Sequence, residues 1–262
     1  MPWENDGGEK KLNLETITRK LLRETGTQFM RAILAGMYIS LGAILMIACK
    51  AAGMPSLVCG MAFSLGLWLV VSCNGELFTG NCLMIPYMGY GIETEYVDDG
   101  KSEGVKVHST TTMLVLKNLV VTYVGNAIGV LMMVLLSSGN VDGGTLSTMV
   151  DAKTSAGILD IGAKGVLCNI AICLATYVAS SESGAVGRLV ACMLPVTLFV
   201  TCGWEHSIAD MFLVMAAGNF SAGALMLVAM ATLGNIVGGW LISNFLQMSN
   251  DTTILREMDV EE

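Results

Sequence analysis

The sequence predicts an all-α, polytopic membrane protein with six transmembrane helices. Of its 262 residues, 53% are hydrophobic and only 14% are charged, whereas soluble domains carry roughly 25% charged residues. The mean hydropathy is +0.64. A helix needs about 20 residues to cross the apolar core of a bilayer, and six apolar stretches reach that length. They cover roughly residues 32–53, 57–90, 112–137, 159–181, 188–217 and 222–247.

The second and fifth stretches are long and contain polar residues, which predicts a broken helix in each. Asn74-Gly75 and Gly203 are the expected break points. Irregular backbone persists in a membrane only where protein surrounds it or where it lines a cavity. Residues 12–30, before the first stretch, have apolar residues at helical spacing. They predict an amphipathic helix that lies either on the membrane surface or against the rest of the chain.

Three regions follow from this pattern: an N-terminal helical region (1–30), a membrane domain (31–248) and an acidic tail (249–262). With six spans both termini lie on one side, which also carries eleven of the fourteen Lys and Arg residues. The excess predicts cytoplasmic termini and, in a bacterium, the inner membrane. The net charge of −8 argues against nucleic-acid binding, and the cysteines and two histidines lack metal-ligand spacing. We expect neither metal nor cofactor.

Two segments of the chain can be superimposed. CNGELFTGNCLM (73–84) and CGWEHSIADMFL (202–213) share Cys first and Glu fourth, and Asn81 then matches Asp210. GNAIG (125–129) likewise matches GNIVG (234–238). Each half, about 31–138 and 157–248, would hold three spans, so the second half enters the membrane from the opposite side. Asn126 and Asn235 are expected to cap backbone groups that the breaks leave free.

Three ionisable residues, Glu205, His206 and Asp210, lie in the middle of the fifth stretch. Such groups usually mark a solute pathway. Burial favours a neutral imidazole for His206, which can donate a hydrogen bond to an anion, relay a proton, or merely hold helices together. Glu205 and its counterpart Glu76 are expected to accept hydrogen bonds from backbone N–H groups at the breaks. Asp210, at i+4, would bond the break or tune His206.

The motifs NGELFTGN (74–81) and GWEHSIADMF (203–212), with VLCNIAICLA (166–175) and LPVTLFV (194–200), resemble the formate/nitrite transporter family. The resemblance covers nearly the whole chain. It implies an aquaporin-like fold, a homopentamer in the lipid bilayer and a pore in each protomer. It also implies passage of small monovalent anions of weak acids. We expect formate first, with hydrosulfide and nitrite as alternatives.

The resemblance also implies roles for single residues. Four would line the substrate pathway and five would narrow it: His206, Thr79, Lys153 and Asn169 for the pathway, and Leu77, Phe199, Phe63, Leu67 and Phe78 for the constriction. From spacing alone, Lys153 is an ordinary loop lysine. Asn169 could donate an amide proton to the pore or only bridge helices. Two features depart from the family pattern, namely a long, acidic 88–108 connection and Asp210 at a position where asparagine is common.

Three other functions were weighed. A pore for water or glycerol would show paired Asn-Pro-Ala boxes and an arginine within a span, and this sequence has neither. A membrane enzyme would need a nucleophile with its base, a metal cluster or a cofactor motif. A scaffold without transport would not explain two matching broken spans. The sequence therefore predicts a transporter or channel and not an enzyme.

Overall fold

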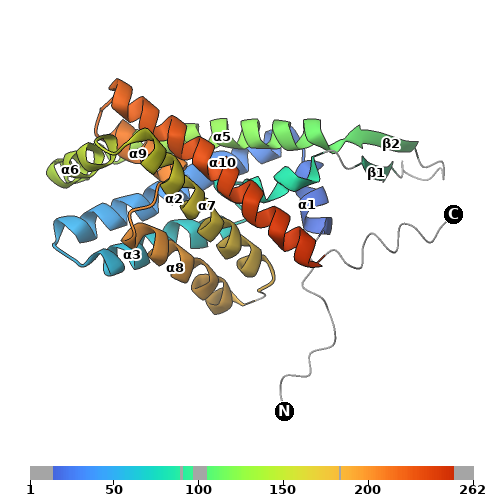
Figure 1. Cartoon of the computed structure of the whole chain (residues 1–262), viewed down its shortest axis with the longest axis horizontal. Coiled ribbons are helices and arrows are strands. Elements are labelled where there is room, and N and C mark those ends of the chain that lie inside the picture. The colour runs from blue at the N-terminus through green and yellow to red at the C-terminus, as the bar shows by residue number, and fades with distance from the viewer. Residues whose placement is uncertain (1–13, 89–90, 97–104, 183, 251–262) are drawn as a thin grey trace, which may run out of the picture.

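A computed structural model describes residues 14–88, 91–96, 105–182 and 184–250, and it is helical almost throughout (Figure 1). Four of the described helices are long and apolar enough to cross a bilayer: α2 (Thr25–Ala51), α5 (Thr111–Leu136), α7 (Ile158–Ser180) and α10 (Ala222–Asn250). Three shorter apolar helices are α3 (Ser56–Ser72), α8 (Ala185–Thr201) and α9 (Ser207–Ala216). The helical fold is as predicted, and the count of six crossings stays a prediction.

The second and fifth apolar stretches are each broken. The second is divided into α3, the single turn α4 (Phe78–Asn81) and the 3₁₀ helix η1 (Cys82–Tyr87). The fifth is divided into α8 and α9, with an extended segment between them. Both breaks fall where the sequence predicted them.

The two halves of the chain have the same order of elements. α2 packs against α3 and α5, and α7 packs against α8 and α10. Each half begins with a short helix, α1 (Leu14–Leu21) in the first and α6 (Gly143–Thr154) in the second. α1 ends at Leu21 and α2 begins at Thr25, and α6 and α7 are separated by the same number of residues, from Thr154 to Ile158. The repeat therefore includes both short helices. Figure 1 shows α6 at the opposite end of the molecule from α1, as an inverted repeat requires.

Glycine allows the long helices of each half to approach closely. A Cβ atom on Gly129 of α5 would collide with the backbone oxygen of Ile33 on α2. One on Gly238 of α10 would collide in the same way with the oxygen of Val166 on α7. Small residues at a helix interface let the backbones touch, which is a main source of packing energy in membranes.

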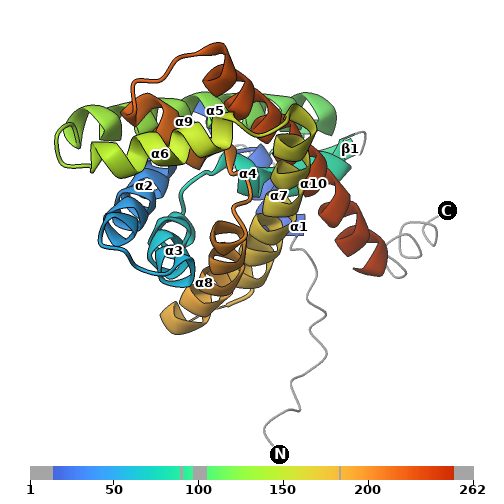
Figure 2. The same ribbon diagram turned by 60° about the vertical axis from the view of Figure 1, so that its left-hand side comes forward.

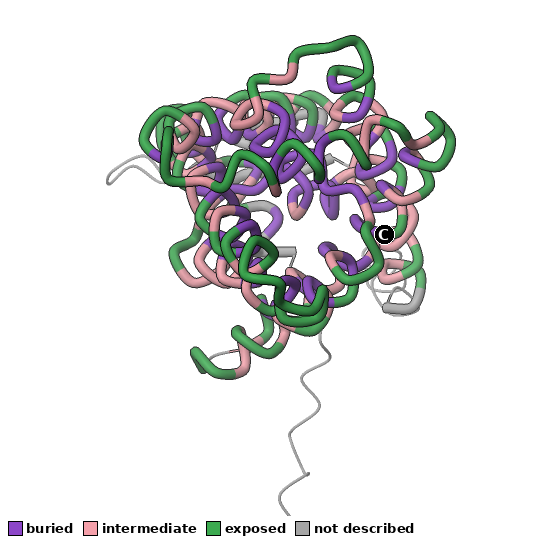
Figure 3. The backbone as a smooth tube through the Cα atoms, turned by 90° about the vertical axis from the view of Figure 1, so that its left-hand side faces the viewer, coloured by how far each residue is buried: buried purple, intermediate pink, exposed green. Residues whose placement is uncertain are grey.

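The helices enclose an interior of both apolar and polar side chains. α3 and α8 pack side by side and close one flank (Figure 2). Seen along the long axis, buried residues gather toward the middle and exposed residues outline the outside (Figure 3). Many of the exposed side chains are large and apolar, among them Leu135 (69% exposed) and Leu159 (85% exposed). Such a surface is suited to lipid or to neighbouring protomers.

Three parts of the structure add to the predictions. The 88–108 connection contains an antiparallel hairpin, β1 (Gly91–Tyr96) with β2 (Val105–Thr110), which the sequence did not predict. Helix α1 buries Ile17 and Leu21 against the chain, which is the second of the two arrangements considered for residues 12–30. α6 was not predicted at all. The acidic tail beyond residue 250 and the first 13 residues lie outside the described part.

Candidate functional site

The helix breaks arise from matched backbone turns. Asn74 and Gly203 have φ values of 53° and 67°, in the left-handed region that ends a helix when it follows the C-cap. After α3, the N–H of Gly75 donates to the oxygen of Val70 at 2.7 Å. After α8, the N–H of Trp204 donates to the oxygen of Phe199 at 2.9 Å. These bonds close a Schellman motif at each helix end, so the chain leaves the helix in the same way in both halves.

Two buried asparagines secure the extended segments that follow. The side chain of Asn126 donates to the oxygens of Ala32 and Glu76, each at 2.8 Å, and accepts from the N–H of Phe78 at 2.9 Å. Asn126 is completely buried. Two of its three bonds, to Glu76 and Phe78, therefore satisfy backbone groups that no helix pairs, as the sequence predicted for this residue.

Asn235 has the same role in the second half. It donates to the oxygens of Gly165 and Glu205 at 2.8 and 2.9 Å, and it accepts from the N–H of Ser207 at 2.9 Å. The agreement in donors, acceptors and distances shows that the two halves share a structural repeat.

For Glu76 and Glu205 the expected backbone N–H partners are not the observed ones, and their structural role stays a prediction. Their carboxylates pair with cations and not with backbone N–H groups, because the asparagines already fill that role. Glu76 pairs with Arg23 and, at 3.2 Å, with Lys20. Lys20 also donates to the oxygen of Asn81 at 2.9 Å. Glu76 is 1% exposed, so these cations from α1 and the turn after it compensate a buried charge.

The matching cluster lies at the other end, on α6 and α9. Lys153 pairs with Glu205 and, at 3.0 Å, with Asp210. Lys153 is on a helix and its side chain is 19% exposed, so it is not a solvated loop lysine. Burial alone would lower the pKa of its ammonium group, but the charges of Asp210 and Glu205 outweigh burial and raise that pKa. Lys153 therefore stays charged.

His206 and Thr79 meet between these two clusters. The Nε2 atom of His206 lies 3.0 Å from the hydroxyl oxygen of Thr79, and both side chains are at most 1% exposed. The N–H of Ala209 donates to Nδ1 of His206 at 3.1 Å. Because Nδ1 accepts, a neutral imidazole carries its proton on Nε2 and donates it to Thr79. The hydroxyl proton of Thr79 can then be donated to a third group.

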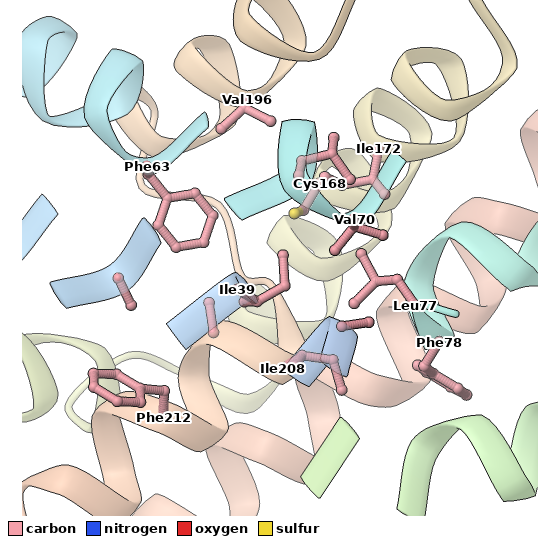
Figure 4. Packing of buried hydrophobic residues seen from close by; sticks show 14 of the residues in the cluster. Ile39, Phe63, Val70, Leu77, Phe78, Cys168, Ile172, Val196, Ile208 and Phe212 are labelled. Atoms are coloured by element: carbon pink, nitrogen blue, oxygen red, sulfur yellow. The ribbon is translucent and has the colours of Figure 1, made fainter. Parts of the chain in front are cut away.

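Apolar rings surround the histidine. The ring of Phe199 stacks on the His206 imidazole at 5.8 Å and 16°, and Phe63 meets Phe199 edge-on at 5.8 Å. Leu77, the counterpart of His206 in the first half, is 2% exposed. Figure 4 shows Phe63 and Leu77 on either side of Ile39 within the buried cluster. The imidazole of His206 and the hydroxyl of Thr79 therefore lie among apolar side chains.

Two cavities reach these apolar side chains from opposite ends. The α6-side cavity has a volume of about 390 Å³, and its lining includes Phe63, Phe199 and His206. The α1-side cavity has a volume of about 300 Å³, and its lining includes Leu77. The basic residues divide in the same way between them. Lys50, Lys153 and Lys164 line the first, and Arg19, Lys20, Arg23, Arg31 and Arg188 line the second.

Four of the predicted site residues line neither cavity, namely Thr79, Asn169, Phe78 and Leu67. Asn169 donates to the oxygen of Asn235 at 2.5 Å, which joins α7 to α10 and fits the bridging alternative. Phe78 packs edge-on against Tyr123 at 4.8 Å, on the far side of the cluster from Phe63 (Figure 4). Leu67 is fully buried in the core. Arg23 is a site residue that sequence reasoning missed, because no pattern shows which cation reaches Glu76.

Comparison with known proteins identifies the family. The model of the family described as "Formate/nitrite transporter" matches residues 10–95 and 103–248. The chain belongs to the formate/nitrite transporter family. Relatives in this family include a probable formate transporter of Methanothermobacter thermautotrophicus, 30% identical over 250 residues that cover 82% of this chain and 85% of that protein. The formate channel FocA of Escherichia coli is 30% identical over 253 residues, with 82% of each chain covered. The nitrite transporter NirC of Escherichia coli is 30% identical over 222 residues, which cover 79% of this chain and 76% of that protein.

Solved structures of the formate/nitrite transporter family share the fold. One, described as a pentameric formate channel with formate bound, has a TM-score of 0.66 and 26% identity, covering 86% of this chain and 96% of that one. Another, described as an FNT family ion channel, has a TM-score of 0.73 and 25% identity, covering 90% and 95%. The predicted family and fold class are confirmed. The chain is a multi-pass membrane transporter or channel and not an enzyme.

Proposed function

We propose that each protomer is a transmembrane passage for small monovalent anions of weak acids, with formate as the first substrate and hydrosulfide or nitrite as alternatives. The observation that carries the proposal is the pair of cavities that end at His206 and Leu77, on either side of the Thr79–His206 hydrogen bond. Relatives named formate transporter, nitrite transporter and formate channel support the same class of substrate.

The charged side chains in the two cavities, and the apolar zone between the cavities, suit an anion that takes up a proton in that zone. Both cavities are lined by Lys or Arg side chains, whose positive charge raises the local concentration of anions. The zone between them offers the rings of Phe63 and Phe199 and the hydroxyl of Thr79, and no cation. A bare carboxylate in such surroundings costs many kcal/mol, and real groups take up a proton instead. A weak acid can do so, whereas chloride cannot.

His206 acts in this scheme as a hydrogen-bond donor. Its Nδ1 atom is occupied by the N–H of Ala209, so an imidazolium would place two N–H donors against each other. The geometry therefore favours a neutral ring that orients Thr79, whose hydroxyl proton is donated to the passing solute. Of the three roles expected for His206, this geometry favours hydrogen-bond donation, made here to Thr79, over relay of a proton.

We also propose that the chain forms a homopentamer with six crossings per protomer and cytoplasmic termini. A neighbour described as pentameric supports the assembly. Four long and three shorter apolar helices, two of the latter joined across a break, suit six crossings. The α1 end carries more of the Lys and Arg residues that line the cavities, and such residues are enriched on the cytoplasmic side.

Uptake into proteoliposomes tests the proposal. Formate, nitrite, hydrosulfide, glycerol and water would be compared for the wild type, His206→Ala and His108→Ala. The last is a matched control, because His108 is the only other histidine in the sequence. We expect anion uptake in the wild type and the control, and a loss on the order of 100-fold in His206→Ala. Permeation of glycerol or water without any anion would overturn the proposal.

A further inference from the structure

The two ion-pair clusters occupy equivalent places in the repeat but differ in charge. Near α1, two cations, Lys20 and Arg23, face the carboxylate of Glu76 and the neutral amide of Asn81. Near α6, a single cation, Lys153, faces two carboxylates. With every acid ionised, the α1-side cluster has a net charge of +1 and the α6-side cluster has a net charge of −1.

One of the two charges in this difference comes from the second cation near α1, and the other comes from Asp210. Asp210 stands where the first half has Asn81, and it is 1% exposed. Its Oδ1 atom is 3.0 Å from the ammonium nitrogen of Lys153, and its Oδ2 atom is buried without a hydrogen-bond partner. The carboxylates of Asp210 and Glu205 share the ammonium group of Lys153 as their partner. A proton on this pair would cancel the excess negative charge and supply the bond that Oδ2 lacks.

We propose that the Glu205–Asp210 carboxyl pair in the α6-side cavity is a proton-binding site, and that a proton and a substrate anion bind in this cavity together. The inference rests on the proposed function for the identity of the anion. An anion entering beside an unprotonated pair meets a net negative cluster, and beside a singly protonated pair it meets a neutral one. Binding of each therefore favours binding of the other by the same factor.

Other charged and titratable groups surround the pair. Lys153 comes from α6, Cys168 and Lys164 from α7, Lys50 from α2, and His206 precedes α9. Lys164 pairs with Asp160 at 2.6 Å. α10 carries no charged residue, and the one in α5, Lys117, adjoins Asn118 at the α1 end. His206 is held as a neutral ring by the N–H of Ala209. The carboxyl pair is thus the group whose charge changes.

Asp210→Asn tests the proposal, since it makes the α6-side cluster resemble the α1-side one. Asp151→Asn is the matched control, because Asp151 is an exposed carboxylate on α6 that lines neither cavity. Formate uptake into proteoliposomes would be measured at equal pH on both sides, so that protomer orientation has no effect. Uptake into empty liposomes would be subtracted.

In the wild type and in Asp151→Asn, we expect the KM for formate to rise by up to about tenfold per pH unit above the pH at which the pair loses its proton. In Asp210→Asn we expect a change of less than about twofold over the same range. An Asp210→Asn profile that follows the wild type would overturn the proposal.

Infrared difference spectroscopy gives a second readout that does not depend on transport. The wild type and Asp151→Asn should show a protonated carboxyl band that disappears as the pH is raised, and Asp210→Asn should lack it. A wild type without this band would refute the proton site even if formate is transported. A wild type with the band but without formate uptake would refute the proposed function and leave the proton site standing.

Discussion

Replacement of Asn235 by alanine would remove the support of the second helix break. The substitution deletes three hydrogen bonds, to the N–H of Ser207 and to the oxygens of Glu205 and Gly165. The first two groups lie outside the helical ladder, and each costs about 1–3 kcal/mol when left buried and unpaired. Gly165 lies within α7 and keeps its helical hydrogen bond. The expected loss of unfolding free energy is therefore about 4 kcal/mol.

A loss of this size should lower the unfolding temperature by on the order of 10 °C for a chain of this length. Thermal unfolding in one detergent would be compared for Asn235→Ala, Asn126→Ala and Asn244→Ala. Asn244 is an exposed residue of the same helix as Asn235 and donates one bond, to the oxygen of Trp240. We expect Asn126→Ala to match Asn235→Ala within about 1 kcal/mol and Asn244→Ala to cost about 0.5 kcal/mol or less. The account would be refuted if Asn235→Ala unfolded at the temperature of Asn244→Ala.

Three further predictions concern other contacts. Gly238→Ala should push α10 away from Val166 and lower the unfolding temperature, whereas Gly143→Ala, at the start of α6 with open space around it, should disturb no helix contact; equal behaviour would argue against close packing. Glu76→Gln should cost about 2 kcal/mol, because it leaves two partly exposed cations without their buried partner, and the cost should shrink at high salt; a salt-independent cost would contradict this. The Thr145 N–H bond holds the pKa of Asp142 below its ordinary value, so this cap should be formed above about pH 4 and be lost as the pH falls further; hydrogen exchange at the start of α6 should show that dependence in the wild type and not in Asp142→Asn.

The sequence was sufficient for the features that depend on local chemistry. Apolar length gave the long helices, and Asn74 and Gly203 marked the breaks because few other residues end a helix in the left-handed conformation. The paired Gly-Asn motifs correctly predicted that Asn126 and Asn235 cap the breaks. Each of these inferences needs only a short window of sequence and the rule that buried backbone groups must be paired.

The sequence was insufficient where distant segments meet. Glu76 was expected to bond the backbone, because nothing in its neighbourhood shows that α1 brings Lys20 and Arg23 to it. Helix α6 was missed because it is short and only weakly apolar, so neither span length nor periodicity reveals it. Its position decides the role of Lys153. The sequence showed that Asp210 stands where asparagine is common in the family. Its role could be inferred only once the structure placed Lys153 beside it.

The central claim is that the solute passes at the contact between Thr79 of the first break and His206 of the second. A double-mutant cycle in formate flux through proteoliposomes tests it most directly, with Thr79→Val, His206→Ala and the double variant. Residues that act as one unit lose activity together, so each single change should lower flux on the order of 100-fold and the double change should lower it no further. Single variants with wild-type flux, or losses that multiply in the double variant, would contradict the account.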